Sequence, residues 1–271
     1  ELDSLGVSRQ QVVVLSGNPQ QTATDHQVRA VGRYQLSRIW RKLGRKALLI
    51  SGGGSLFHDV TSWRTVPYYL SIVEMALLRK SPVIFYGQGV GPIKRAIYRK
   101  WVVSGFERVG TASVRDRTSM KILADWGCTK LPLLSTDPVF GLPPVRTTPY
   151  QGVQINLRPY PGWSTHQLTW VDFVHKLVNQ GQQVRFIPLG PGDREIGLFL
   201  QHHVPELVIC EPHNVREAMA LCGGAKVFVT MRLHGMIMAA CHGKASVALA
   251  YDPKVQAIGI ELGVPVVAPI P

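Results

Sequence analysis

Residues 225–241, AKVFVTMRLHGMIMAAC, contain a strand, a turn and a helix in direct succession. The apolar run 225–229 predicts a buried strand, and the run of small and apolar residues 236–241 predicts a helix. Between them, Arg232 and His234 stand where free backbone N–H groups and the helix dipole favour an anion. A strand that leads straight into a helix is the repeating unit of α/β folds.

The rest of the chain repeats this alternation, which predicts parallel sheets covered by helices on both faces. A proline-rich break at 141–149 interrupts it. We therefore expect two Rossmann-like domains, residues 1–145 and 146–271, that face a cleft. The expected strands are 12–15, 47–50, 82–86, 112–114, 152–157, 184–188, 207–210, 225–229 and 246–250. The expected helices are 33–42, 68–79, 97–106, 118–125, 170–179, 194–203, 214–221 and 236–241.

The composition is that of a globular protein with an anionic partner. The 271 residues are 45% hydrophobic and 17% charged, and the net charge is +13. Such a charge suits a phosphorylated small molecule, an acidic membrane surface or nucleic acid. The cations form only short clusters, at 38–45, 94–100 and 115–121, and no nucleic-acid-binding motif is present. We therefore expect no nucleic acid partner.

The cysteines and the apolar runs exclude two further classes. The four cysteines have no CxxC spacing and no signal peptide precedes them, so we expect neither a disulfide framework nor a metal site. No apolar run reaches the ~18 residues that a membrane span needs. We expect a cytoplasmic protein whose basic surface suits peripheral contact with the inner face of the plasma membrane. Nothing in the sequence specifies an oligomeric state.

Two glycine-containing loops follow predicted strands. Residues 51–59, SGGGSLFHD, match neither a Walker A loop nor GxGxxG, so this loop is either a tight turn or a place where backbone approaches a ligand. Asp59 is a candidate acceptor for a sugar hydroxyl, or a general base. The loop at 87–92 either brings Gln88 to the cleft or packs a helix on a strand. The three glycines of the first loop are Gly52, Gly53 and Gly54.

Charged residues follow other predicted strands. Arg115 and Arg117 would share a face if the strand alternation continued through them. Asp137 is either part of a capped turn or an acidic group at the cleft. Arg158 closes the first strand of the second half, and we expect it to face the same cleft as Arg232.

Taken together and in this order, these motifs resemble the polysaccharide pyruvyl transferase family. The resemblance is strongest to the cell-surface anchoring type, bacterial enzymes that pyruvylate cell-wall polysaccharide precursors, and it covers nearly the whole chain. The motifs that carry it are SGGGSLFHDVTS (51–62), YGQGVGP (86–92), SVRD (113–116), TDPVF (136–140), INLRP (155–159), MRLHG (231–235) and YDPK (251–254).

The resemblance implies two domains arranged as in GT-B glycosyltransferases, an acceptor side in the first and a donor side in the second. It implies phosphoenolpyruvate (PEP) as donor, a sugar or lipid-linked saccharide as acceptor, and a cyclic pyruvyl ketal and phosphate as products, without cofactor or metal. Members usually extend further at both ends, so we expect this chain to be either a natural short form or one trimmed at both chain ends. The matching donor-binding and catalytic residues are Arg115, Arg232, His234 and Lys254, with Arg158 as an addition.

PEP carries a phosphate and a carboxylate, so several Arg and Lys side chains would suit it. We expect Arg232 and Lys254 to hold one end of PEP, and Arg115 or Arg158 the other. The alternatives are a GT-B glycosyltransferase that uses a nucleotide sugar and a non-catalytic protein that binds anionic glycans, because strand-end Arg and His bind a diphosphate equally well. The candidate acid–base residues are His234 for the donor, and Asp59 and Asp137 for the acceptor hydroxyl.

Overall fold

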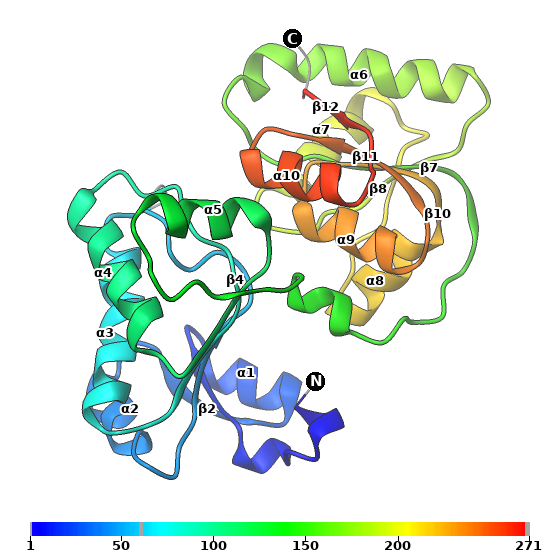
Figure 1. Ribbon diagram of the computed structural model, residues 1–271. Coiled ribbons are helices and arrows are strands. Elements are labelled where there is room, and N and C mark those ends of the chain that lie inside the picture. The colour runs from blue at the N-terminus through cyan, green and yellow to red at the C-terminus, as the bar shows by residue number, and fades with distance from the viewer. Residues whose placement is uncertain (1, 60–61, 269–271) are drawn as a thin grey trace. The chain divides into compact units, whose positions relative to one another are not determined.

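The computed structural model describes residues 2–59 and 62–268, which form two compact units (Figure 1). The first unit spans Glu1–Gly141 and the second Leu142–Pro271, so the chain divides at the start of the proline-rich break, just before the boundary expected at 145. Residues 60 and 61, which belong to the motif at 51–62, lie outside the described part.

The second unit contains a six-stranded parallel sheet in the order β12-β11-β10-β7-β8-β9. Its strands are β7 (Tyr150–Asn156), β8 (Val184–Phe186), β9 (Val208–Ile209), β10 (Ala225–Thr230), β11 (Ala245–Leu249) and β12 (Val266–Val267). Its helices are α6 (Trp163–Asn179), α7 (Asp193–His203), α8 (Val215–Gly224), α9 (Leu233–Cys241) and α10 (Pro253–Glu261). The helices cover both faces, as expected: α7 packs its Gly197 on Phe186, and α9 packs its Gly235 on Phe228 (Figure 1).

The strand order of the second unit reverses at β7. From this first strand, β8 and β9 extend the sheet on one side, whereas β10, β11 and β12 extend it on the other. Pairing aligns Asn156 with Thr230, the last residues of β7 and β10. In open α/β sheets, ligands bind outside the carboxyl ends of the strands where the order reverses. The carboxyl ends of β7 and β10 are therefore where this unit favours a ligand.

The first unit contains two parallel sheets, β1-β2 and β3-β4-β5-β6. Its strands are β1 (Val13–Ser16), β2 (Arg29–Gly32), β3 (Leu49–Gly52), β4 (Val83–Gln88), β5 (Thr111–Val114) and β6 (Leu133–Leu134). Its helices are α1 (Pro19–His26), α2 (Leu36–Lys42), α3 (Thr65–Leu78), α4 (Ala96–Arg108) and α5 (Arg117–Asp125), with short 3-10 turns at Asp3–Leu5, Arg9–Gln11 and Pro138–Gly141. The core centres on Phe57, Phe85 and Phe106, which are all fully buried; Phe106 makes edge contacts with the other two rings, and those two are tilted against each other.

One face of the larger sheet in the first unit departs from the expected two-sided cover. β3, β4, β5 and β6 follow one another in chain order, and right-handed crossovers in one direction place α3, α4 and α5 on the same face. Val83 and Phe85 are buried on that face. On the opposite face Ile50, Tyr86 and Leu133 remain 42%, 36% and 68% exposed.

Several elements were absent from the sequence-based expectation: α1, α10, β2, β6 and β12. α1 has no buried residue and hence no apolar period, and it is marked instead by its cap, Asn18, and by Pro19 in its first turn. α10 is likewise marked by Asp252 and Pro253. Within residues 2–59 and 62–268, no helix combines the length and the apolar character needed to cross a bilayer.

Candidate active site

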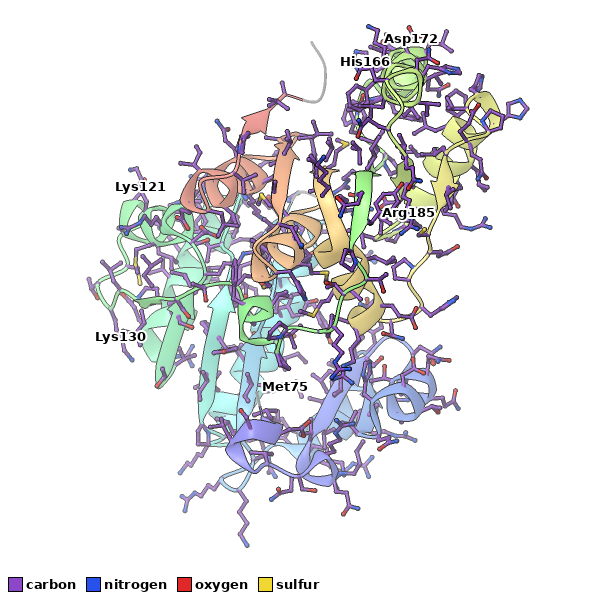
Figure 2. The ribbon with its side chains drawn as sticks, turned by 90° about the vertical axis from the view of Figure 1, so that its right-hand side faces the viewer. Met75, Lys121, Lys130, His166, Asp172 and Arg185 are labelled. Carbon is purple, nitrogen blue, oxygen red and sulfur yellow. The ribbon has the colours of Figure 1, made fainter. Side chains whose placement is uncertain are left out.

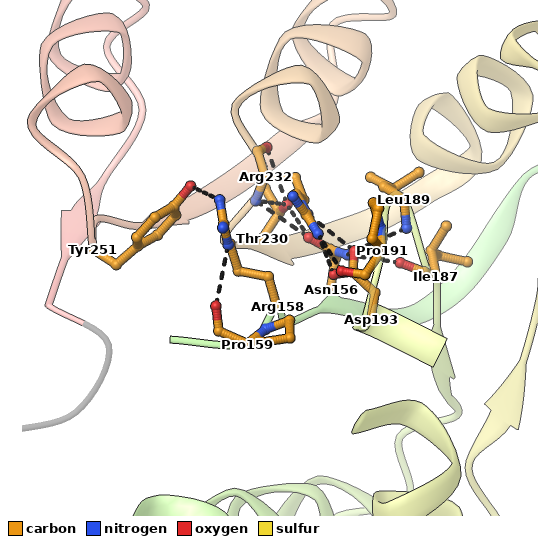
Figure 3. Close-up of polar contacts among 10 residues, drawn as sticks. All are labelled: Asn156, Arg158, Pro159, Ile187, Leu189, Pro191, Asp193, Thr230, Arg232 and Tyr251. Atoms are coloured by element: carbon orange, nitrogen blue, oxygen red, sulfur yellow. Dashed lines mark hydrogen bonds and ion pairs between the residues drawn. The ribbon is translucent and has the colours of Figure 1, made fainter. Parts of the chain in front are cut away.

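Asn156, the last residue of β7, is fully buried and ties three strand ends together. Its side-chain nitrogen donates to the Ile187 carbonyl at 2.9 Å and to the Asp193 carboxylate at 3.0 Å. Its side-chain oxygen accepts from the Thr230 hydroxyl at 3.1 Å and from the backbone N–H of Arg232 at 3.2 Å (Figure 3). Both donors and the acceptor of the amide are thus used, and the turns after β7, β8 and β10 are held in register.

Arg232 is oriented by a buried carboxylate. Its Nε lies 3.0 Å from Asp193 Oδ2 and its Nη2 lies 2.5 Å from Oδ1, which makes a bidentate ion pair (Figure 3). Asp193 is fully buried and also accepts from the Leu189 N–H at 3.1 Å. Nη2 also donates to the Pro191 carbonyl at 3.1 Å, and a Cβ on Gly190 would come within 2.8 Å of it. The pair fixes the guanidinium and compensates its charge.

Arg158 differs from Arg232 in having no acidic partner. Because Asn156 is aligned with Thr230, the two arginines leave neighbouring strands at the same level. Arg158 donates through Nη1 to the Tyr251 hydroxyl, and its guanidinium lies over the Tyr251 ring, 4.5 Å from the centroid (Figure 3). Among the described residues no carboxylate forms an ion pair with it. Arg158 is therefore a positioned cation whose charge remains available to an anion.

His234 and Lys254 lie in the first turns of α9 and α10, the helices that follow β10 and β11. His234 is exposed and Lys254 is half-buried. Asp252 caps α10, its carboxylate accepting from the Lys254 N–H at 2.8 Å. The positive ends of both helix dipoles add to the field of the side chains. Four basic residues predicted for the donor site thus lie at the carboxyl edge of one sheet.

Arg115, the remaining predicted donor ligand, lies in the first unit and is buried, with its side chain 3% exposed. Its Nη1 lies 2.6 Å from Asp137 Oδ2, and its Nη2 donates to the Ser55 hydroxyl at 2.9 Å. Asp116 Oδ2 lies 3.6 Å from its Nε. The two predicted site residues Arg115 and Asp137 therefore pair with each other. Arg117 does not share a face with Arg115, as alternation suggested, because the strand ends at Val114 and α5 begins at Arg117, which is exposed.

An Arg115→Lys variant tests whether this pair is structural. Lysine keeps the charge but lacks the planar fork whose two nitrogens bond Asp137 and Ser55 separately, so we expect unfolding free energy to fall by about 1–3 kcal/mol. Denaturant unfolding measures this change. If the variant still folds, its affinity for PEP should stay within about threefold of the affinity of the unaltered chain. Lost PEP binding at unchanged stability would contradict a structural role.

The glycine-rich loop and the Gln88 loop are bonded to each other. The Gly53 N–H donates to the Tyr86 carbonyl at 3.0 Å, and the Gly89 N–H donates to the Gly54 carbonyl at 2.9 Å. Gln88 is fully buried, and its amide nitrogen donates to the Ser51 carbonyl at 2.7 Å. A Cβ on Gly52 would lie 2.6 Å from the Tyr86 carbonyl oxygen, so glycine is needed there for close packing. These contacts show that Gly52, Gly53, Gly54 and Gln88 pack the two loops against each other. A ligand-binding role for the four residues stays a prediction.

Asp59 anchors the turn before α4. Its two oxygens accept from the Lys94 N–H at 2.9 and 3.1 Å, and one also accepts from the Arg95 N–H at 3.3 Å. Burial raises the pKa of Asp59, but these backbone donors and the nearby cationic side chains together bring it below its usual value. A carboxylate with a lowered pKa is a weak proton acceptor. This environment favours an anchoring role, and catalysis by Asp59 stays a prediction.

Sequence reasoning missed Asn156, Asp193 and Tyr251. Asn156 and Tyr251 stand inside motifs from which only the basic residues were selected, INLRP and YDPK. Asp193 follows a polar loop after a strand and opens a helix, a position where an acidic residue is an ordinary first-turn feature. Across the described residues, no group of three or more His, Cys, Asp or Glu side chains could hold a metal ion.

Fold and site together define an α/β protein with parallel sheets that gathers basic side chains at the carboxyl edge of one of them. A family model of polysaccharide pyruvyl transferases matches residues 1–253, and the chain belongs to this family. The amylovoran biosynthesis protein AmsJ of Erwinia amylovora is 23% identical over 273 residues. That match covers 88% of this chain and 65% of AmsJ, so the chain spans less than two thirds of that relative.

Solved structures confirm the fold class. UDP-GlcNAc 2-epimerase from Methanocaldococcus jannaschii superposes with a TM-score of 0.64 at 12% identity, over 94% of this chain and 80% of that one. Anabaena HepE, crystallised with UDP-glucose, gives a TM-score of 0.55 at 10% identity, over 93% and 75%. At these identities the likeness concerns the fold alone, and it confirms the expected GT-B-like α/β architecture.

Proposed function

We propose that this chain transfers a pyruvyl group from PEP to a sugar of a cell-surface polysaccharide precursor, forming a ketal and releasing phosphate. Membership of the polysaccharide pyruvyl transferase family supports a transferase that acts in polysaccharide biosynthesis. The observation that carries the donor assignment is Arg158, a guanidinium at the point where strand order reverses that pairs with no carboxylate of residues 2–59 and 62–268.

The contacts of the second unit suggest how its cations divide the work. Arg158 would take one anionic group of PEP as the principal ligand, since no carboxylate in the described part of the chain compensates its charge. Arg232 would donate to PEP through Nη1, the guanidinium nitrogen that contacts neither Asp193 nor Pro191. Its direction is fixed because those two residues hold Nε and Nη2. Lys254 would take the other end of PEP. This division differs from the one expected from sequence, in which Arg232 and Lys254 held one end of PEP and Arg115 or Arg158 held the other.

The reaction delivers one proton to carbon and removes one from each of two hydroxyls. The first sugar hydroxyl loses its proton as its oxygen bonds to the central carbon of PEP, and a proton is delivered to the methylene carbon, which becomes the methyl group. The bond between the central carbon and the phosphate oxygen then breaks, and phosphate leaves with the electron pair. The second hydroxyl oxygen bonds in its place, closes the ketal and gives up its proton, which balances the charge of the released phosphate. His234 is the candidate for these transfers, because it is exposed at the carboxyl edge of the sheet and histidine is the side chain that most often acts as a general acid or base.

The same proposal places the donor site in the second unit and the acceptor side in the first. It includes a lipid-linked acceptor and a cytoplasmic location, both of which the family resemblance implies. A nucleotide-sugar glycosyltransferase is the second candidate. It is favoured by the fold shared with proteins crystallised with UDP or UDP-sugars, since the same arginines would suit a diphosphate.

Thermal unfolding with PEP, UDP or GDP separates these candidates. A ligand at about one hundred times its Kd stabilises the folded state by about 2.7 kcal/mol, which raises the melting temperature. We expect PEP to do so, Arg158→Gln to abolish the shift, and Arg216→Gln, an exposed change on α8, to leave it intact. A shift with UDP or GDP alone would establish the second candidate. A full PEP shift in the Arg158→Gln protein would place the donor elsewhere.

A further inference from the structure

The structure assigns the surface around α2 a role in docking to an anionic lipid bilayer. From residue 26 to residue 58 the chain carries seven Arg and Lys residues and no Asp or Glu. Five of these cations lie on α2 or directly after it, and all five are exposed. The five cations are Arg38, Arg41, Lys42, Arg45 and Lys46. Together with two exposed apolar residues of the same helix, Leu36 and Trp40, they form what we call the α2 surface.

Apolar side chains stand among these cations. α2 buries Ile39 in the core, whereas Leu36 and Trp40, one helical turn apart, remain 47% and 38% exposed. Trp40 is held by Arg79, at the end of α3, whose guanidinium carbon lies 5.2 Å from the Trp40 ring centroid. Arg79 also donates to the Leu43 carbonyl, so α2 is fixed beside α3 (Figure 1). A rigid helix thus presents a tryptophan and a leucine within a basic field.

The two other basic clusters of the sequence each contain cations that are paired with carboxylates, in contrast to the α2 surface. In the cluster at 94–100, Arg95 pairs with Asp59 at 3.6 Å. In the cluster at 115–121, Arg115 pairs with Asp137, and Lys121 pairs with Asp125 at 2.9 Å. Lys121 lies on the outside of the first unit, as does Lys130 (Figure 2). Within the described part of the chain, no ion pair involves a cation of the α2 surface. This cluster therefore keeps its full charge.

Charge and apolar content together select the partner. Each basic side chain near an anionic leaflet adds to binding, and tryptophan and leucine insert at the headgroup boundary. RNA or DNA would use the same cations, but it would have no use for an exposed leucine. The α2 surface therefore fits a bilayer that contains anionic lipid, and it acts independently of the donor site in the second unit.

Co-sedimentation with vesicles tests this surface. We expect the chain to bind phosphatidylcholine vesicles that contain phosphatidylglycerol, and not phosphatidylcholine alone, and to be released by salt. The charge reversal Arg38→Glu/Arg41→Glu/Arg45→Glu should weaken binding about a hundredfold. The matched reversal Lys176→Glu/Arg216→Glu/Lys226→Glu, at exposed cations of the second unit, changes net charge equally and should weaken it less than about threefold.

A second variant separates lipid from nucleic acid. Leu36→Ser/Trp40→Ser keeps every charge, so it should weaken vesicle binding about tenfold or more while binding to a double-stranded RNA, which depends on its phosphates, is unaffected. Melting temperatures establish that each variant is folded. Equal losses in the two charge-reversed proteins, RNA binding without vesicle binding, or vesicle binding insensitive to Leu36 and Trp40 would each overturn the proposal. None of these outcomes depends on PEP.

Discussion

Replacing His234 by alanine is expected to lower turnover roughly 100- to 10,000-fold, the range in which a positioned acid–base group contributes. The measurement is phosphate released from PEP with an acceptor preparation that supports turnover by the unaltered chain. His234 is exposed in the first turn of α9, so its removal should change the unfolding free energy by no more than about 0.5 kcal/mol. Thermal stabilisation by PEP should persist, because the arginines remain.

His202→Ala is the matched control for this experiment. His202 is also an exposed histidine of the second unit, on α7, and its removal should leave turnover unchanged. A His234→Ala protein that retains full turnover would exclude His234 from proton transfer. A protein that loses turnover together with the PEP-induced shift would assign His234 to donor binding instead.

Replacing Asp193 by asparagine is expected to lower the unfolding free energy by about 3 kcal/mol. Asp193 is fully buried and is bidentate to Arg232, and removing one partner of such a pair leaves the other charge uncompensated. The value lies at the low end of the usual range because the Arg232 side chain is 19% exposed. Denaturant unfolding at neutral pH measures the loss.

A double-mutant cycle attributes this loss to the pair. Combined with Arg232→Gln, the Asp193→Asn change should show a coupling energy of about 1–3 kcal/mol. Asp172→Asn, on the exposed side of α6 (Figure 2), should have almost no effect. Simple additivity of the two single changes would show that Asp193 stabilises the protein through Asn156 and Leu189, and not through Arg232.

Local pattern was sufficient for the α/β class, for most strands and helices, and for the position of each motif after a strand. The expected strands at 112–114 and 225–229 agree with β5 and β10 within one residue at each end. Arg158, Arg232, His234 and Lys254 could be placed at strand ends because hydrophobic runs stop just before them. Elements without an apolar period, such as α1, could be found only through their caps.

Which arginine forms an ion pair with which carboxylate could not be predicted from local sequence patterns. Arg232 and Asp193 stand 39 residues apart, and Arg115 and Asp137 stand 22 apart, so no local period links them. The sequence therefore offered Arg115, Arg158 and Arg232 as anion ligands without indicating which of them a carboxylate already holds. The folded chain buries carboxylates against Arg115 and Arg232, whereas none of the carboxylates that the structure describes pairs with Arg158.

The amino-acid pattern thus established the family, the alternation of strands and helices, and the edge of the sheet where basic residues gather. Folding determined which of those residues still carry an uncompensated charge. The reason is physical: hydrophobic periodicity and helix caps depend on neighbours along the chain, whereas the charge that a ligand meets depends on which distant carboxylates the strand order brings into contact.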